Sequence, residues 1–278
     1  MIETPNMTLQ PVSDAEFRLI QQLIYKMAGV HIKEHKKTMV ANRLRRRLDN
    51  FGFSSYKKYY DFITQSPEGH NELIEFVNCL TTNETFFFRH GEQLDTLADK
   101  LIPRCLERIS PSEKCRIWSS ACSSGEEPYS VAMLLDYKLK PEVLNRIEIL
   151  ASDINMQVIE RARQGLYKPY ALQKIQPYFK TRYFKQLSID QFALSESIRD
   201  RVQFFRHNLL DHNPYGRFDI ILCRNVMIYF DLESKNRVLH QLNRSLKSHG
   251  YLITGYAESL FRTETNLKYI QPTLYNKG

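Results

Sequence analysis

The sequence predicts an α/β protein with a doubly wound, mostly parallel sheet, preceded by a small helical domain. Three patterns carry this prediction. Residues 12–80 place apolar side chains at helical spacing. From residue 115, short and almost continuously apolar runs alternate with helical stretches, which is typical of a parallel sheet buried on both faces. The alternation stalls over residues 166–202, which indicates an insertion with short strands.

The helical domain contains four predicted helices. The first, residues 12–29, is capped by Ser13 or Asp14 and ends at Gly29. The other three cover residues 35–50, 54–64 and 71–80, with a break at residues 66–69.

The second predicted helix, residues 35–50, carries a basic face. Its inner, apolar positions are Val40, Leu44 and Leu48. Arg43 and Arg47 lie four residues apart at the edge of that stripe, while Arg45 and Arg46 point further outwards. Such a face is either simply solvated or binds an acidic partner. Phosphate-binding surfaces usually add aromatic platforms or a groove-fitting helix, and neither is present, so we favour an acidic protein helix as its partner.

Residues 81–89, TTNETFFFR, follow the helical domain. By itself a polar stretch ending in three aromatic residues is typical of an interdomain connector. Asn83, Thr85 and Arg89 are nevertheless potential ligand contacts, and the phenylalanines could pack or stack.

The α/β part begins after a helix at residues 93–108, interrupted by Pro103, and a polar hinge at residues 110–114. The predicted strands are residues 115–122, 147–153, 202–208, 218–224 and 251–255. The predicted helices are residues 126–139, 156–165 and 233–247, the last ending by Gly250. The tail, residues 269–275, fits a final antiparallel edge strand.

Residues 115–130 predict a strand, a tight turn and a helix, with a ligand site at the turn. Small side chains from Ser119 to Ser124 let a ligand approach the backbone, and ligands of open α/β sheets bind beyond the carboxyl ends of the strands. Glu126 and Glu127 at the helix start would repel a phosphate, so a cationic or hydroxyl-bearing ligand fits better. Alternatively, these acids merely stabilise the helix N-terminus.

Polar residues also follow the other predicted strands. Asp153 ends the second strand, where an acid commonly accepts ribose hydroxyls, although it could instead cap the next helix. Asn208 with Leu209, and Asn225 with Val226, come after the next two strands. This lining, without a catalytic triad or a lysine, suits adenosine attached to a cationic group. S-adenosylmethionine is such a ligand.

The composition limits the class of protein. The 278 residues are 42% hydrophobic and 25% charged, as in soluble globular proteins, and no apolar run approaches the roughly 18 residues of a membrane helix. The polar, acidic N-terminus does not predict a signal peptide. Five cysteines without CxxC spacing indicate reduced thiols in a cytoplasmic protein, and the scattered histidines predict no metal site. The net charge of +8 favours an acidic partner, either nucleic acid or protein.

The sequence resembles the CheR-type chemotaxis receptor glutamate methyltransferases from its first helices to its last strand. The matching motifs are TTNETFFFR (81–89), WSSACSSGEEPYS (118–130), ASDI (151–154), FFRHNLL (204–210) and FDIILCRNVMIYF (218–230). The resemblance implies an all-α receptor-recognition domain at 1–80, a linker contributing cofactor contacts at 81–112, and an S-adenosylmethionine-dependent, Rossmann-like methyltransferase domain at 113–278. It also implies a small antiparallel β-subdomain inserted at about 166–202.

The resemblance further implies transfer of a methyl group from S-adenosylmethionine to receptor glutamates, leaving S-adenosylhomocysteine. The implied cofactor contacts are Asn83, Thr85, Arg89, Glu126, Asp153, Asn208, Leu209, Asn225 and Val226, with Glu127 in support. Arg43, Arg46 and Arg47 would bind substrate. No catalytic general base is expected, because a glutamate carboxylate is already ionised at neutral pH. The implied partner is the cytoplasmic signalling domain of methyl-accepting chemotaxis receptors, bound by a monomer without nucleic acid or membrane insertion.

Two segments depart from the family pattern. Residues 255–260, GYAESL, replace a GHSE-like turn, so Tyr256 and Ala257 are expected to alter the pocket rim. The insertion lacks the Gly-rich loop that family members use to dock a receptor's C-terminal tether, which predicts direct recognition of the receptor instead. The alternatives are a nucleic-acid methyltransferase and a non-catalytic S-adenosylmethionine-binding scaffold.

Overall fold

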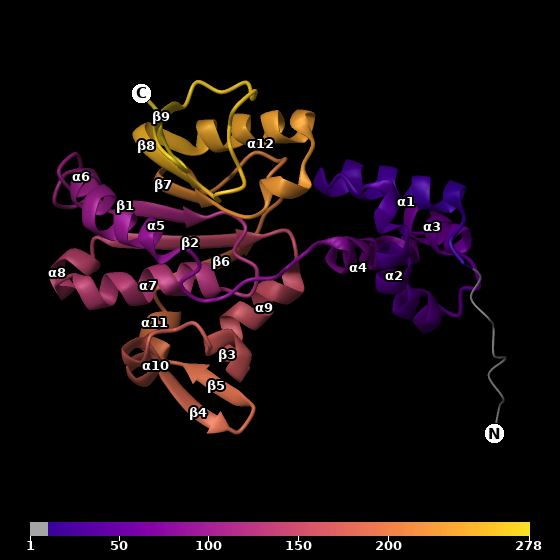
Figure 1. The fold of residues 1–278 in the computed structure, drawn as a ribbon, viewed down its shortest axis with the longest axis horizontal. Helices are drawn as coiled ribbons and strands as arrows, with labels where there is room; N and C mark the ends of the chain where they lie inside the picture. The colour runs from indigo at the N-terminus through magenta and orange to yellow at the C-terminus, as the bar shows by residue number, and fades with distance from the viewer. Residues whose placement is uncertain (1–10) are drawn as a thin grey trace. The chain divides into compact units, whose positions relative to one another are not determined.

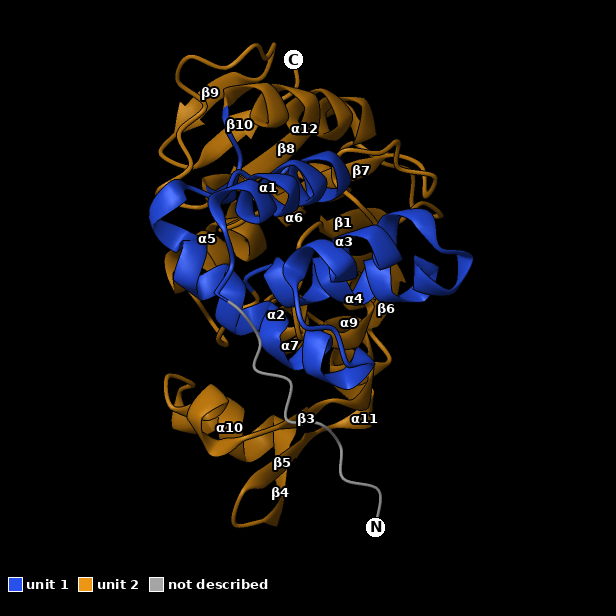
Figure 2. Cartoon of the chain, turned by 90° about the vertical axis from the view of Figure 1, so that its right-hand side faces the viewer, with its two compact units in different colours: residues 1–82, 229–231 blue, residues 83–228, 232–278 orange. Residues whose placement is uncertain are grey.

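The computed structural model describes residues 11–278, and the chain forms two compact units (Figure 2). Unit 1 comprises Met1–Thr82 and Tyr229–Asp231, and unit 2 comprises Asn83–Ile228 and Leu232–Gly278. The N-terminal ten residues, on which the prediction of no signal peptide partly rests, lie outside the described residues. Within residues 11–278, no helix has the length and apolar character needed to cross a membrane.

Unit 1 is helical. Its helices are α1 (Asp14–Ala28), η1 (Glu34–Lys36), α2 (Lys37–Phe51), α3 (Tyr56–Gln65), η2 (Pro67–Gly69) and α4 (His70–Leu80). Ser13 caps α1 in a reciprocal capping box with Glu16, and Gly29 ends it in a left-handed conformation at φ 70°. The predicted inner face of α2 is buried, as are Phe17 and Phe76 of the flanking helices. Residues Tyr229–Asp231 join this unit because the Tyr229 carbonyl accepts the His31 N–H at 2.8 Å.

Unit 2 is built on a seven-stranded sheet in the order β6-β2-β1-β7-β8-β10-β9 (Figure 1). Its strands are β1 (Cys115–Ser119), β2 (Ile147–Asp153), β6 (Val202–Arg206), β7 (Phe218–Cys223), β8 (Leu246–Thr254), β9 (Lys268–Gln271) and β10 (Leu274–Asn276). The first five are parallel, and β10 and β9 are antiparallel additions at one edge. The chain winds outward from β1 to β6 and then returns to β7 on the other side of β1. The predicted doubly wound, mostly parallel sheet is therefore confirmed.

Helices flank this sheet because its strands are apolar on both faces; every residue of β7 is buried. They are α5 (Gly91–Thr96), the π-helical turn η3 (Leu97–Leu101), α6 (Ile102–Leu106), α7 (Glu126–Lys138), α8 (Pro141–Leu144), α9 (Met156–Gln164), η5 (Met227–Tyr229, shared with unit 1) and α12 (Leu232–Ser245). Both α7 and α9 pack against β2 and β6, and α12 packs against β8.

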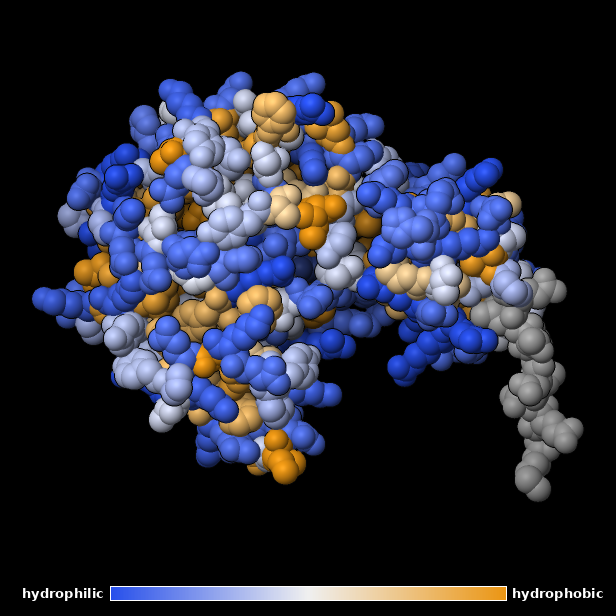
Figure 3. Space-filling model, in the orientation of Figure 1, coloured by the Kyte–Doolittle hydropathy of each residue, from blue (hydrophilic) through white to orange (hydrophobic). Residues whose placement is uncertain are grey.

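The insertion is a second, three-stranded antiparallel sheet in the order β3-β5-β4, which confirms the predicted small subdomain. Its elements are β3 (Leu166–Tyr167), η4 (Pro169–Leu172), α10 (Pro177–Tyr183), β4 (Phe184–Ser188), β5 (Gln191–Leu194) and α11 (Glu196–Arg199). The tip of the β4–β5 hairpin exposes Leu187 and Ile189, and Figure 3 shows apolar atoms there at the bottom of the view.

Two predicted elements are wrong in detail. The tail is a hairpin of β9 and β10 rather than one strand, because Pro272 lacks an N–H and Thr273 adopts φ 68°. The helix predicted over residues 93–108 runs from Gly91 to Leu106, and its irregularity is the π-helical turn that ends just before Pro103.

Candidate functional site

The candidate site lies at the carboxyl edge of the parallel strands of unit 2. The strand order reverses between β1 and β7, and a crevice at such a reversal is where open α/β sheets bind ligands. The backbone joins the strand ends there: the Ser120 N–H donates to Leu222 of β7 at 2.9 Å, and the Cys122 N–H donates to Ser152 of β2 at 2.8 Å. The His207 N–H in turn donates to the Asp153 carbonyl at 3.0 Å, which places the end of β6 beside β2.

The turn between β1 and α7 is tightly constrained. Ser123 and Gly125 both adopt positive φ, 49° and 93°. A Cβ at Gly125 would lie 2.9 Å from the Cβ of Ala162 and 2.9 Å from the Tyr129 ring, so only glycine fits. The Ser123 hydroxyl donates to the Asn83 carbonyl at 2.9 Å. This contact brings the linker motif, including Asn83, against the turn.

Asp153 holds two backbone groups at the end of β2. Its carboxylate accepts the Ser123 N–H and the Asn155 N–H, each at 2.9 Å. The alternative that Asp153 caps the next helix is wrong, because Asn155 is the residue that caps α9. Burial raises the pKa of Asp153, and its backbone hydrogen bonds oppose that shift. A buried carboxylate with unused lone pairs is suited to accept the paired hydroxyls of a ribose.

The two glutamates at the start of α7 have different surroundings. Glu126 is 5% exposed, and its carboxylate accepts the Ser124 hydroxyl at 2.8 and 3.0 Å. Burial raises its pKa, and that hydrogen bond opposes the shift. Glu127 instead pairs with Arg224 at 2.9 Å and accepts the Ser119 hydroxyl at 2.7 Å. Glu127 therefore has structural partners at this edge, and its role in supporting the cofactor site stays a prediction.

Replacing Glu126 with glutamine should remove a pH dependence of stability. Because burial raises the pKa of Glu126 above its ordinary 4.5, the folded state favours the neutral acid. That contribution to stability is complete below the unfolded-state pKa and is lost as pH rises through the raised folded-state value. Urea titrations of the ligand-free proteins should show wild type losing stability relative to Glu126→Gln as pH rises from about 4. If the difference in unfolding free energy between wild type and Glu126→Gln did not change with pH, this prediction would be contradicted.

The linker segment presents Arg89 in an irregular backbone. Phe88 and His90 both adopt φ 55°, and the Phe88 N–H donates to the Ser130 hydroxyl of α7 at 2.8 Å. The Arg89 guanidinium lies 5.3 Å from the Phe86 ring centroid. Its Nε is buried and has no hydrogen-bond partner among the described residues. An unpaired guanidinium N–H is suited to a ligand carboxylate. These contacts are consistent with the prediction that residues 81–89 bind the cofactor as well as connecting the two domains.

The remaining predicted contacts lie at the ends of β6 and β7. Asn208 accepts the Leu210 N–H at 3.2 Å, and Leu209 is buried. Asn225 adopts φ 61°, and the Asn225 and Val226 N–H groups both donate to the Glu258 carboxylate at 2.7 Å. Thr85 is half-buried in the linker.

Two buried charged residues of this edge, Arg224 and Glu258, were not predicted from the sequence. Arg224 follows β7 and donates both to Glu127 and to the Arg89 carbonyl. Glu258 lies in the GYAESL turn and accepts backbone N–H groups from two loops. The available signal for Arg224 was a charge directly after the apolar run of β7, since such charges are rarely buried without partners, whereas Glu258 lies four residues past β8 and had no such signal.

The three arginines predicted to bind substrate lie on α2 of unit 1. Arg43 donates to the Leu80 and Thr81 carbonyls at 3.1 and 3.2 Å, which closes the end of α4. Arg47 forms a two-pronged ion pair with the buried Glu72. Arg46 is exposed and so is the neighbouring Arg45. Two of the three arginines therefore have structural partners, and Arg46 is the one whose side chain is exposed.

Comparison with known proteins identifies the family. "CheR methyltransferase, SAM binding domain" matches residues 83–275, and "CheR methyltransferase, all-alpha domain" matches residues 15–81. The chain belongs to the CheR methyltransferase family. A chemotaxis protein methyltransferase of Borreliella burgdorferi is 38% identical over 98% of this chain and 97% of its own length. One from Escherichia coli is 38% identical over 95% of this chain and 91% of its own length.

The cofactor of this CheR family member is S-adenosylmethionine, and the polar groups of the edge fit it. Buried carboxylates accept hydroxyls and favour a sulfonium, and the unpaired Arg89 Nε–H suits the carboxylate of the methionine moiety. Gly125 lets the Ala162 and Tyr129 side chains pack directly against the backbone at the start of α7, which fixes the turn beside the site. The glutamates at that start would disfavour a phosphate-bearing cofactor.

Proposed function

We propose that this protein methylates side-chain carboxylates of glutamates in the cytoplasmic signalling domain of bacterial chemoreceptors. The observation that best supports this proposal is the set of side chains at the carboxyl edge of the sheet. Asp153 and Glu126 are buried there, and the Arg89 Nε has no hydrogen-bond partner among the described residues. These groups suit a sulfonium nucleoside that carries a carboxylate. The named relatives are chemotaxis protein methyltransferases, which supports receptors as the substrate. When bound, S-adenosylmethionine supplies an electrophilic methyl group that a carboxylate oxygen can accept to form a methyl ester.

The chain's own residues then have binding and orienting roles. Asp153 would hold the ribose hydroxyls, Glu126 the cofactor's cationic or hydroxyl-bearing part, and Arg89 its carboxylate. The receptor glutamate arrives ionised, so no side chain needs to remove a proton. The protein contributes by aligning the reacting atoms and excluding water, which can supply several kcal/mol.

Replacing Arg89 with alanine should raise the dissociation constant for S-adenosylhomocysteine at least tenfold, measured by titration calorimetry. The guanidinium would lose a charge-assisted hydrogen bond to the ligand carboxylate, typically worth about 1.5–3 kcal/mol. Arg104, an exposed arginine of α6, provides the matched Arg→Ala control. Unchanged affinity in a folded Arg89→Ala protein would remove Arg89 from the site.

Receptor recognition is assigned to the exposed part of the basic face on α2. Arg46 projects its charge outward, whereas Arg43 and Arg47 chiefly hold α4. An acidic receptor helix would complement this face. The β4–β5 turn, Ser188 to Gln191, contains no glycine, which favours direct recognition over capture of a receptor tether.

The test is transfer of a labelled methyl group to receptor-containing membranes, followed by release in mild base. Esters release their label, whereas N-methyl products keep it. Wild type should give base-labile label on the receptor, and Arg46→Glu should lower the rate about tenfold at low salt through lost steering. Lys58→Glu, a charge reversal of an exposed lysine on α3, is the control and should have a smaller effect.

Two results would overturn the proposal. Base-stable label on nucleic acid, with affinity falling steeply with salt, would support a nucleic-acid methyltransferase, which the net charge of +8 allows. Cofactor binding without any methyl transfer to receptors would support a scaffold.

A further inference from the structure

The turn after β8 contains a buried carboxylate whose hydrogen-bond partners among residues 11–278 are backbone N–H groups. Glu258 is 2% exposed. Its Oε2 accepts the Asn225 N–H at 2.7 Å and the Gly255 N–H at 2.6 Å. Its Oε1 accepts the Val226 and Met227 N–H groups, each at 2.7 Å. One side chain thus satisfies three consecutive N–H groups of the loop that follows β7.

No ion pair involves Glu258 within residues 11–278, where the groups that its carboxylate binds are backbone N–H groups. Four backbone N–H groups therefore converge on this one carboxylate. The arrangement also fixes a strained conformation. Asn225 adopts φ 61°, a left-handed conformation that a non-glycine residue keeps where its surroundings hold it.

The approach of the two loops is close. A Cβ at Gly255 would lie 2.5 Å from Glu258 Oε2 and 3.0 Å from Asn225 Nδ2. Glycine at this position therefore allows the Glu258 carboxylate to reach the Asn225 backbone.

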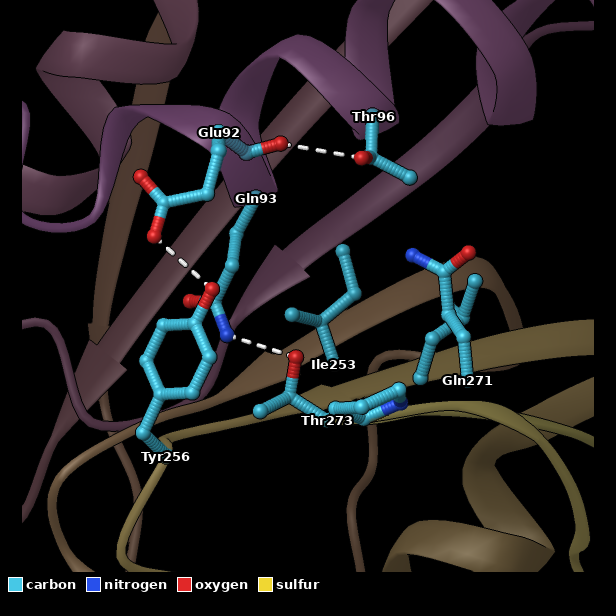
Figure 4. Close-up of a pocket in the computed structure, with 9 residues that line it drawn as sticks. Glu92, Gln93, Thr96, Ile253, Tyr256, Gln271 and Thr273 are labelled. Carbon is cyan, nitrogen blue, oxygen red and sulfur yellow. Dashed lines mark hydrogen bonds between the residues drawn. The ribbon is translucent and has the colours of Figure 1, made fainter.

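The turn that carries Glu258 is anchored on its other side as well. The Tyr256 hydroxyl donates to Glu92 of α5 at 2.7 Å (Figure 4). The ring centroids of Tyr256 and His90 lie 4.8 Å apart. Figure 4 also shows the Gln93 amide donating to the Thr273 hydroxyl at 2.7 Å, and both residues line a pocket of about 210 Å³. The turn is thus tied to α5 and the linker segment.

We propose that Glu258 is a positioning residue for the cofactor: it holds Asn225 and Val226 in the geometry that contacts S-adenosylmethionine. The inference rests on the proposed site, in which Asn225 and Val226 are cofactor contacts. In this proposal Glu258 acts through the loop Asn225–Met227, which it holds, rather than by binding cofactor or substrate itself. It differs from a general stabilising residue because its four hydrogen bonds converge on that loop and on Gly255.

The decisive variant is Glu258→Gln, which preserves shape but replaces one acceptor oxygen with an NH₂ group. That NH₂ group would face two backbone N–H groups, so two hydrogen bonds are lost in either amide orientation. We expect the dissociation constant for S-adenosylhomocysteine to rise about tenfold by calorimetry. KM for S-adenosylmethionine should rise similarly, while kcat at saturation changes less than threefold.

The matched control is Asp219→Asn at the opposite end of β7. Asp219 is also a buried carboxylate, and it accepts the Arg116 N–H and the Lys247 ammonium, each at 2.8 Å. This variant should lower the thermal unfolding midpoint without changing affinity for S-adenosylhomocysteine. A merely structural role for Glu258 would make the two variants alike, lowering the amount of folded protein but leaving KM and affinity unchanged.

Three outcomes would overturn the inference. In the first, folded Glu258→Gln binds S-adenosylhomocysteine as tightly as wild type does. In the second, Asp219→Asn loses as much affinity as Glu258→Gln. In the third, Glu258→Gln binds more weakly but Asn225→Ala binds as tightly as wild type does. The calorimetry contains no receptor. A failure of receptor methylation would therefore leave this result standing, and the two proposals can fail separately.

Discussion

Methionine in place of Arg224 should destabilise the protein by about 3–5 kcal/mol, the cost of removing one partner from a buried ion pair. The Arg224 side chain is 2% exposed and lies 2.9 Å from Glu127, whose side chain is 14% exposed. Arg224 also donates to the Arg89 carbonyl, so its loss should loosen the linker beside the cofactor. Urea unfolding of the ligand-free protein provides the measurement.

The control for this variant is the double mutant Arg224→Met with Glu127→Gln. Removing the stranded carboxylate should recover part of the loss, because most of the cost is the unpaired buried charge. A single mutant within about 1 kcal/mol of wild type would show that the pair is solvated and contributes as little as a surface ion pair.

Replacing Asp153 with asparagine should weaken S-adenosylhomocysteine binding by about tenfold to a hundredfold. The carboxylate would accept ribose hydroxyls as a charged acceptor, and such bonds are worth about 1.5–3 kcal/mol. Asn also accepts through one oxygen only, so the Ser123 and Asn155 N–H groups would compete for it. Calorimetry near neutral pH measures the effect.

Asp190→Asn, an exposed acid at the tip of the β4–β5 hairpin, is the matched control and should leave affinity unchanged. If Asp153→Asn bound as tightly as wild type, the acid at the end of β2 would have only the backbone role seen in the structure.

The parts of the fold that depend on local pattern could be predicted from the sequence. Apolar runs such as residues 218–223 indicated buried parallel strands, and β7 is buried throughout. The caps of α1, Ser13 at its start and Gly29 at its end, could be predicted because capping depends on residues close together in the sequence. The tail was predicted as one strand, although Pro272 lacks an N–H donor and the structure forms a hairpin there.

Pairings between distant residues could not be predicted in this way. Glu258 binds amides 31 to 33 positions earlier in the chain, and Arg224 meets Glu127 across 97 positions. Arg47 looked like part of a basic docking face, but it pairs with Glu72 in α4. Periodicity assigns a face to a helix, whereas these partners depend on which elements pack together.

The most direct test of the account is a crystal structure of this protein with S-adenosylhomocysteine. The account predicts ribose hydroxyls on Asp153, the ligand carboxylate on Arg89, and adenosine beside the loops at Asn208 and Asn225. A well-ordered ligand bound elsewhere, with these strand ends untouched, would contradict it.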